Sequence, residues 1–277
     1  MIVKTDIKNF KETHRILLQT SDFICVSPHP NLRSSISNYN ITFPTAGLIS
    51  SGFTVMPCGC ATISIDKSDN GFGAYLHGPV TKPYIFDGQA DDAEMMITIE
   101  FRPAGLFVLM GINQNELADQ VLPLDVVNPV LSKMLAEVAE KSESISELVA
   151  SLDTLFLANM HVAYRPELMQ ALHIIRNCAG NITVKQLSDD IFYSERQLNR
   201  IFKQIVGTGT KSYSRLIRIN NTFRLLKKPH NSLVMVSDLA GFHDLPHFIH
   251  DFKQVCGITP QEYRNNMSDF YNNTTKF

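Results

Sequence analysis

"GFHDLPHFIHDFKQVCGITPQEYR", residues 241–264, is the stretch that decides the fold of the C-terminal part of the chain. Its apolar residues recur at helical spacing: Phe248, Phe252 and Val255. This spacing predicts a helix whose apolar stripe packs on a domain core. The opposite side of the same helix carries His247, His250 and Lys253. Packing on a core does not require such polar residues, so this face is a candidate binding surface.

An earlier part of the chain repeats this pattern. "VKQLSDDIFYSERQLNRIFKQIVG" is followed by "MVSDLAGFHDLPHFIHDFKQVCG". Gly207 matches Gly257 at an offset of 50, whereas Leu187 matches Val236 at an offset of 49, so the second copy has one extra residue in its turn. Each copy predicts a short helix, a tight turn and a longer helix, which is the helix-turn-helix pattern. The intervening residues 211–226 predict one connecting helix of about 24 Å, which could hold the two longer helices roughly one DNA turn, about 34 Å, apart.

The longer helix of the first copy has the clearer polar face. Ser194 is a good capping residue, and the apolar stripe behind it comprises Leu198, Ile201, Phe202 and Ile205. The opposite face presents Arg196, Asn199, Arg200 and Lys203. Arginine and asparagine bond base edges in the major groove, and lysine neutralises phosphate. We therefore predict that these four residues bind DNA. The alternative is an ordinary solvated helix face.

In the second copy, the predicted DNA-binding residues are Pro246, His247, His250 and Lys253. Histidine is only partly charged near neutral pH, so this face is expected to bind DNA more weakly. Two alternatives remain open here. The histidines are exposed without a role, or His243, His247 and His250 hold zinc, although the cluster lacks a Cys or Glu in a ligand-like position.

Residues 241–264 resemble the C-terminal signature of AraC/XylS-type transcriptional regulators: Gly-Phe, a polar turn, an aromatic residue, Phe-Lys, Gly, Thr-Pro and Tyr-Arg. The resemblance extends back through "YSERQLNRIFKQIVGTGTKSYSRLIRINNTFRLL". It implies a seven-helix domain with two helix-turn-helix units. The implied base-reading positions are Arg196, Asn199 and Arg200 in the first unit, and Leu245, Pro246 and His250 in the second. The second set departs from the polar residues common in the family, and Phe192 stands where the second unit has Gly241.

The distribution of charge also separates the C-terminal part of the chain from the remainder. Of its 277 residues, those from 165 to 268 include 14 Lys and Arg against 8 Asp and Glu, whereas residues 1–164 include 10 against 18. A basic C-terminal part beside an acidic remainder favours contact of the C-terminal part with a polyanion. The charged N-terminus and the lack of a 20-residue apolar run predict a cytoplasmic protein with no membrane partner. Five scattered cysteines predict free thiols.

Residues 41–101 alternate short β-rich runs with Pro, Gly, Asp and Asn, which is typical of a sandwich or barrel. We expect a barrel-like, cupin-like domain, with one or two helices from residue 129 leading out of it. Similarity to the sensor domains of some AraC/XylS-type regulators implies an effector-binding or dimerisation role. Three features suggest more specific sites: a metal- or redox-sensing pair at Cys58 and Cys60, a metal site at His77, and an anion site at Arg102. A structural role explains each of them as well.

The resulting prediction is an α+β, two-domain protein. Residues 1–160 form the β-rich sensor or dimerisation domain with trailing helices, residues 161–268 the all-α DNA-binding domain, and residues 269–277 a tail. We expect an effector-responsive transcriptional regulator that acts as an activator, without catalytic residues, metal or cofactor. Its partners would be double-stranded DNA, RNA polymerase, an unidentified small molecule and a second subunit. The alternative class is a β-barrel enzyme with a helical DNA-binding appendage, as in DNA repair.

Overall fold

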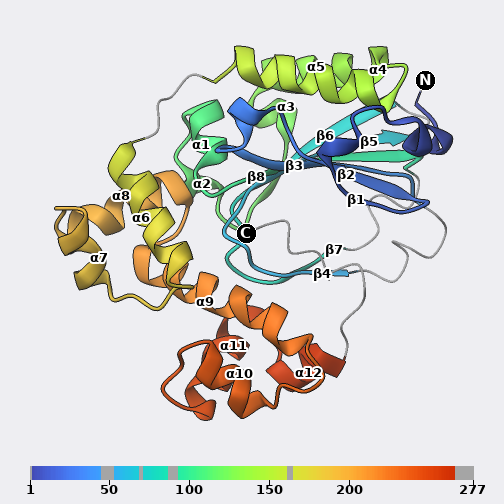
Figure 1. Cartoon of the computed structure of the whole chain (residues 1–277). Coiled ribbons are helices and arrows are strands. Elements are labelled where there is room, and N and C mark those ends of the chain that lie inside the picture. The colour runs from blue at the N-terminus through green and yellow to red at the C-terminus, as the bar shows by residue number, and fades with distance from the viewer. Residues whose placement is uncertain (1, 45–52, 69–70, 87–92, 161–164, 266–277) are drawn as a thin grey trace.

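The computed structural model describes residues 2–44, 53–68, 71–86, 93–160 and 165–265 (Figure 1). A β-rich part comes first and a helical part follows, which confirms the predicted α+β architecture. The last helix of the β domain ends at Ala158 and the next begins at Pro166, while residues 161–164 at the predicted boundary lie outside the described residues. The predicted tail, 269–277, also lies outside them.

Seven strands form one antiparallel sheet in the order β1-β2-β3-β8-β5-β6-β9. They are β1 (Ile16–Gln19), β2 (Phe23–Val26), β3 (Ile36–Thr42), β5 (Thr62–Ser68), β6 (Gly71–His77), β8 (Met95–Phe101) and β9 (Val121–Pro123). A separate two-stranded ribbon pairs β4 (Phe53–Val55) with β7 (Tyr84–Phe86). The predicted barrel-like domain therefore consists of a large sheet and a small ribbon. Strands β1, β2 and β9 were not predicted.

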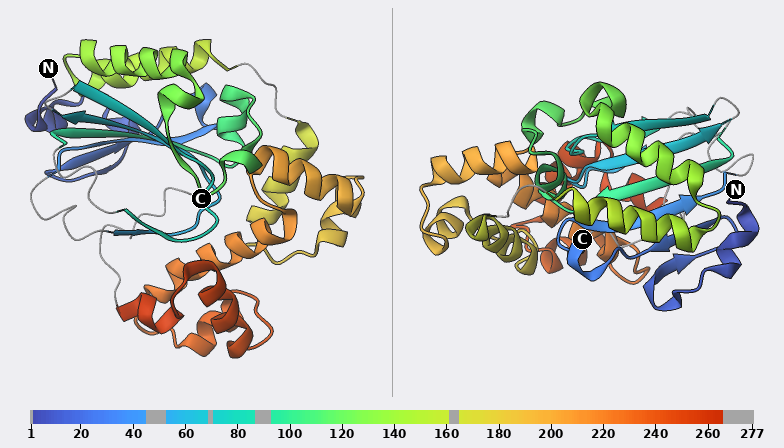
Figure 2. Two further views of the ribbon diagram at one scale, coloured as in Figure 1. Left: turned by 180° about the vertical axis from the view of Figure 1, so that it is seen from behind. Right: turned by 90° about the horizontal axis from the view of Figure 1, so that it is seen from above.

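The two faces of the sheet differ in chemistry. One face is aliphatic, because strand alternation points Ile41, Ile97, Ile63 and Leu76 to the same side, where they are fully buried. Helices α4 (Pro129–Lys141) and α5 (Ile145–Ala158) cover this face (Figures 1 and 2). The two helices expected to lead out of the β domain instead complete its core.

A buried ion pair fastens α5 beneath the edge of the sheet. Arg15 Nη2 lies 2.7 Å from Asp153 Oδ2, and both side chains are buried. Asp153 Oδ1 also accepts from the Tyr39 hydroxyl at 3.0 Å and from the His29 backbone N–H at 2.9 Å. A buried ion pair contributes only when its remaining lone pairs are satisfied, and here the carboxylate has a partner on each oxygen. Six short helices complete this domain: η1 (Lys4–Asn9), η2 (Thr13–Arg15), η3 (Pro30–Leu32), α1 (Gly105–Met110), α2 (Gln114–Leu117) and α3 (Leu124–Val127).

The other face of the sheet is polar. His77 is 7% exposed, its Nε2 lies 3.1 Å from Ser64 Oγ, and its Nδ1 lies 3.3 Å from the Tyr84 hydroxyl of the ribbon. Burial lowers the pKa of His77 to about 4. Nearby on β5, burial raises the pKa of Asp66 to about 6, and its Oδ1 is a buried acceptor without a hydrogen-bond partner. Among the described residues, His77 thus joins sheet to ribbon as a neutral imidazole.

Because the pKa of His77 is about 4 in the folded chain and near 6.5 when unfolded, only the unfolded chain binds a proton between these values. Stability should therefore fall as the pH drops from 6.5 to 4. We expect His77→Gln to remove up to about 3 kcal/mol of this loss, measured as the difference between wild-type and variant urea midpoints at several pH values. Asp66 titrates in both proteins and cancels in the difference. Parallel pH profiles would contradict the assignment.

The C-terminal part consists of seven helices within residues 165–265: α6 (Pro166–Asn177), α7 (Val184–Asp190), α8 (Glu195–Val206), α9 (Thr210–Leu226), α10 (Leu233–Leu239), α11 (Leu245–Cys256) and α12 (Pro260–Asn265). This matches the number expected. Helix α9 lies between two hydrophobic clusters and contributes to both: Tyr213 and Ile217 to the first, Leu216 and Ile219 to the second. Of the helices described here, none has the length and apolar character needed to span a membrane.

Candidate nucleic-acid interface

Two structurally equivalent helix pairs make up the candidate interface. Helices α7 and α8 are joined by residues 191–194, and α10 and α11 by residues 240–244. The second turn is thus one residue longer, as the change of offset predicts. Both turns place one residue in the left-handed region, Phe192 at φ 57° and Gly241 at φ 75°. Both longer helices end at a left-handed glycine, Gly207 and Gly257.

Helix α8 has the predicted amphipathic character. Ser194 caps it, with Oγ accepting from the Gln197 N–H at 3.2 Å. Its apolar stripe is buried, and Phe202 packs against Tyr213 of α9 with ring centroids 5.7 Å apart. The predicted contact residues Arg196, Arg200 and Lys203 are all exposed. A rigid helix therefore presents three cations on one side.

Asn199 differs from the other three predicted residues. It is half-buried, and its Oδ1 accepts from the backbone N–H of Thr210 at 3.2 Å, at the first turn of α9. Bidentate bonding to adenine needs both the amide oxygen and the amide nitrogen. Since the oxygen already holds α9, only the Nδ2 donors of Asn199 remain for DNA while this bond persists. The sequence did not reveal this second role.

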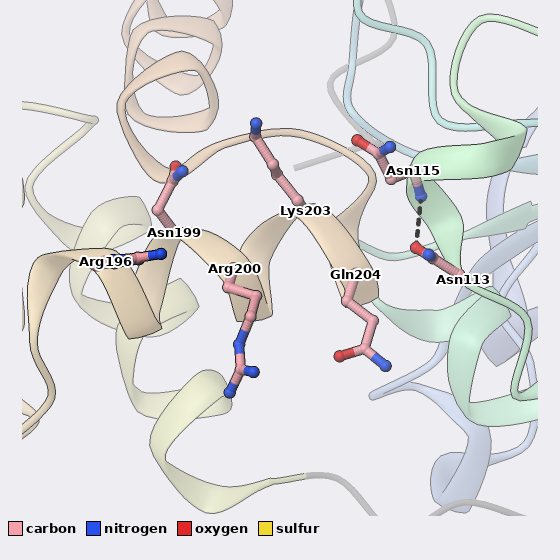
Figure 3. A pocket seen from close by; sticks show the side chains of 7 residues that line it. All are labelled: Asn113, Asn115, Arg196, Asn199, Arg200, Lys203 and Gln204. Atoms are coloured by element: carbon pink, nitrogen blue, oxygen red, sulfur yellow. Dashed lines mark hydrogen bonds between the residues drawn. The ribbon is translucent and has the colours of Figure 1, made fainter.

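A hollow of about 450 Å³ lies along the exposed side of α8. Helix α8 lines it with Arg196, Asn199, Arg200, Lys203 and Gln204, and the β domain adds Asn113 and Asn115 (Figure 3). Four of the lining residues are the predicted contact residues of the first unit. The two asparagines were not predicted, because only the packing of the two domains brings them there.

Helix α11 has a less cationic exposed face. Asp244 caps it, with Oδ1 accepting from the His247 N–H at 2.7 Å. The predicted contact residues Pro246, His247, His250 and Lys253 are exposed, whereas Leu245 is half-buried. Both histidines lie near the buried Asp251 carboxylate, at 3.5 and 3.6 Å. The face therefore offers one lysine ammonium group and two imidazole rings.

Asp251 faces inward and holds α11 against α9. Its Oδ2 lies 3.6 Å from Arg215 Nε, and Arg215 Nη1 donates to Gln254 Oε1 at 2.6 Å. The acid therefore does not lie on the outward face of α11, where it would repel phosphate. It serves the packing of the second unit.

The β domain is docked on both units and on the helix between them. Asn220 of α9 donates to the Pro57 carbonyl at 3.1 Å. A Cβ placed on Gly207 would lie 2.8 Å from Pro79 Cγ, and one on the equivalent Gly257 would lie 3.2 Å from Pro83 Cγ. Two prolines of the β6–β7 connection thus contact the same position of each repeat.

The other candidate sites have structural partners. Cys58 and Cys60 are buried, and each thiol approaches the other residue's carbonyl. Arg102 Nε donates to the Arg33 carbonyl at 2.7 Å. Within the residues that the structure describes, no group of three or more His, Cys, Asp or Glu is arranged to hold a metal ion, and this includes His243, His247 and His250. All five cysteines are free thiols.

Comparison with known protein families matches both domains. Residues 187–266 match a helix-turn-helix domain, and residues 25–123 match a domain of unknown function, DUF6597. The helical part is thus a helix-turn-helix domain.

The transcriptional regulator ArgR of Pseudomonas aeruginosa is 30% identical over 110 residues, which cover 39% of this chain and 33% of that protein. The xylose operon regulatory protein of Escherichia coli is 28% identical over 140 residues, covering 48% and 36%. The chain therefore spans about a third of the length of these curated relatives. The similarity of this domain confirms the resemblance to AraC-type transcriptional regulators found in the sequence.

Among solved structures, an AraC-type DNA-binding domain from Chromobacterium violaceum is 28% identical, with a TM-score of 0.35, and covers 38% of this chain and 94% of that chain. ToxT from Vibrio cholerae is 11% identical, with a TM-score of 0.41, and covers 88% of this chain and 97% of that chain.

Phe192 gives a test of the repeated turn. It is 95% exposed and adopts φ 57°, a conformation that costs residues other than glycine about 1–2 kcal/mol. Phe192→Gly should relieve this strain and raise the free energy of unfolding by about 0.5–1 kcal/mol, because the greater freedom of glycine in the unfolded chain offsets part of the gain. Urea denaturation measures the change.

Phe192→Ala is the matched control, since it removes the ring but keeps the strain. It should leave stability within about 0.5 kcal/mol of the wild type. Equal effects of the two substitutions would show that the ring, and not the backbone, determines the result.

Proposed function

We propose that the chain is a cytoplasmic, sequence-specific DNA-binding transcriptional regulator whose two helix-turn-helix units read adjacent major-groove segments of one duplex. One observation carries this proposal: two equivalent helices, α8 and α11, present exposed polar faces while a single helix, α9, packs on both. The family assignment of residues 187–266 supports it. The two units would serve as one reading surface.

In this proposal α8 supplies most of the affinity and base selectivity. Arg196 and Arg200 are fully charged, and the planar fork of each can bond both acceptors of a guanine. Lys203 and the free Nδ2 donors of Asn199 would bond phosphate or a base edge. All four lie along the same hollow (Figure 3), so a groove could engage them together.

Helix α11 would contribute more to positioning than to base selection. Lys253 is its permanent cation, and His247 and His250 can donate to phosphate oxygens. Pro246 would make apolar contact near the start of the helix. This unequal division predicts an operator with one strongly and one weakly specified half.

The β domain, residues 1–160, would respond to a small-molecule effector or pair two subunits, and the DNA-binding domain would comprise residues 161–268. The polar, largely buried sheet face around Ser64, Asp66 and His77 supports an effector role, because buried polar groups without full partners are costly unless something satisfies them. Contact with RNA polymerase belongs to the same proposal, as expected for an activator.

The central test is selection of bound sites from random DNA with the full chain, followed by Arg200→Ala. Loss of one arginine fork should weaken binding to the selected site by about 1–3 kcal/mol and relax base preference at one position. Competition binding against single-base variants of the selected site measures both effects.

Arg33→Ala is the matched control, because Arg33 is also exposed but belongs to the β domain. It should leave affinity and selectivity unchanged. If Arg200→Ala behaves like Arg33→Ala, α8 is not the reading helix. If the full chain ignores every duplex at low salt, the proposed function is wrong.

A further inference from the structure

The hollow beside α8 is formed by both domains. Five of its lining residues come from α8, and the other two, Asn113 and Asn115, come from α2 and its cap in the β domain. Figure 3 shows the two asparagines at the end of the hollow beside Lys203 and Gln204. The surface next to the reading helix therefore continues onto the β domain.

Helix α2 is fixed in this position by packing at the end of α8. A Cβ on Gly207 would lie 3.0 Å from the Gln114 carbonyl as well as 2.8 Å from Pro79, so only a glycine admits this approach. Gln114 itself is 2% exposed. Asp119, just beyond α2, accepts from the Thr81 backbone N–H at 2.6 Å and fastens α2 to the segment that carries Pro79. The contact between α2 and α8 is therefore close, and the hydrogen bond of Asp119 stabilises it.

The two asparagines differ in how far they are already engaged. Asn113 caps α2, with Oδ1 accepting from the Asn115 N–H at 3.1 Å and Nδ2 donating to Glu116 Oε1 at 3.0 Å. Asn115 is exposed, and its side-chain amide makes no hydrogen bond within the described part of the chain. Asn115 thus carries two amide donors free to meet a ligand that enters the hollow.

We propose that α2 is part of the DNA interface and that the Asn115 amide donates to a phosphate beside the major-groove segment read by α8. This rests on the proposed function. A helix with its side chains is about 10–12 Å across and fills a groove about 12 Å wide, so groups level with its outward face meet the flanking sugar-phosphate backbone. The β domain then positions the reading helix and also binds the duplex directly.

The chemistry of the hollow favours an anionic partner. Arg196, Arg200 and Lys203 give it three positive charges, and its remaining lining residues are neutral amides. Glu116 is the neighbouring acid on α2, but it is not among the lining residues, and its carboxylate accepts from Asn113. A phosphate at the α2 end of the hollow would therefore meet amide donors with the cations of α8 beside them.

Substitutions that change the charge at position 115 test this contact in the full chain. Asn115→Lys should add one phosphate neutralisation, so the slope of log K against log salt should steepen by about 0.9, and affinity should rise up to about tenfold at 0.1 M salt. Asn115→Glu should weaken binding by a similar factor. Fluorescence anisotropy with the selected duplex at four salt concentrations measures both quantities.

Glu140→Gln and Lys141→Gln are matched controls. They change the net charge by the same amounts on α4, which Figure 1 places at the end of the β domain away from α8. Both should leave the slope unchanged. If position 115 and the controls give the same small effects while Arg200→Ala still weakens binding, α2 does not contact DNA and the proposed function stands. If Asn115→Lys weakens binding, α2 obstructs the duplex and the inference is overturned.

Discussion

The rest of the structure depends on helix α9, which two hydrophobic clusters share. Tyr213 and Ile217 belong to the core of the first helix-turn-helix unit, and Leu216 and Ile219 belong to that of the second. Neighbouring residues of one helix thus bury their side chains in different units. Helix α9 is a continuous 17-residue helix without a proline or glycine that would kink it, so it holds the two longer helices in a defined relation. The polar faces of α8 and α11 can serve one duplex only if this relation holds.

Polar contacts strengthen the same arrangement and also explain its asymmetry. Asn199 gives its side-chain oxygen to the start of α9, and Asp251 gives its carboxylate to Arg215 on α9. Each unit therefore uses a side-chain oxygen of one polar residue on its longer helix to hold the connecting helix. The first unit keeps three permanent cations after this, whereas the second keeps Lys253 and two histidines. The β domain then contacts both units through Pro79 and Pro83, at the equivalent glycines of the repeat.

Much of the helical domain could be predicted because its signals are local. Capping by Ser194 and Asp244, the apolar stripes and the terminal glycines depend on residues within one or two turns. The sequence repeat then indicated that the two helix-turn-helix units have the same internal arrangement. The edge strands β1 and β9 are only four and three residues long, which leaves too little alternation to detect. Asn115 carries no sequence signal at all, since domain packing alone brings α2 beside α8. The engagement of Asn199 and the inward direction of Asp251 likewise depend on contacts with α9 that sequence spacing does not encode.

Methylation interference on the selected duplex tests the account most directly, because it reports which guanine N7 atoms in the major groove must be free for binding. Two tandem reading helices held by α9 predict two clusters of interference about 10 base pairs apart on the same face of the duplex. The cluster opposite α8 should be the stronger. A single cluster, or two clusters on opposite faces, would contradict the claim that one duplex engages both units at once.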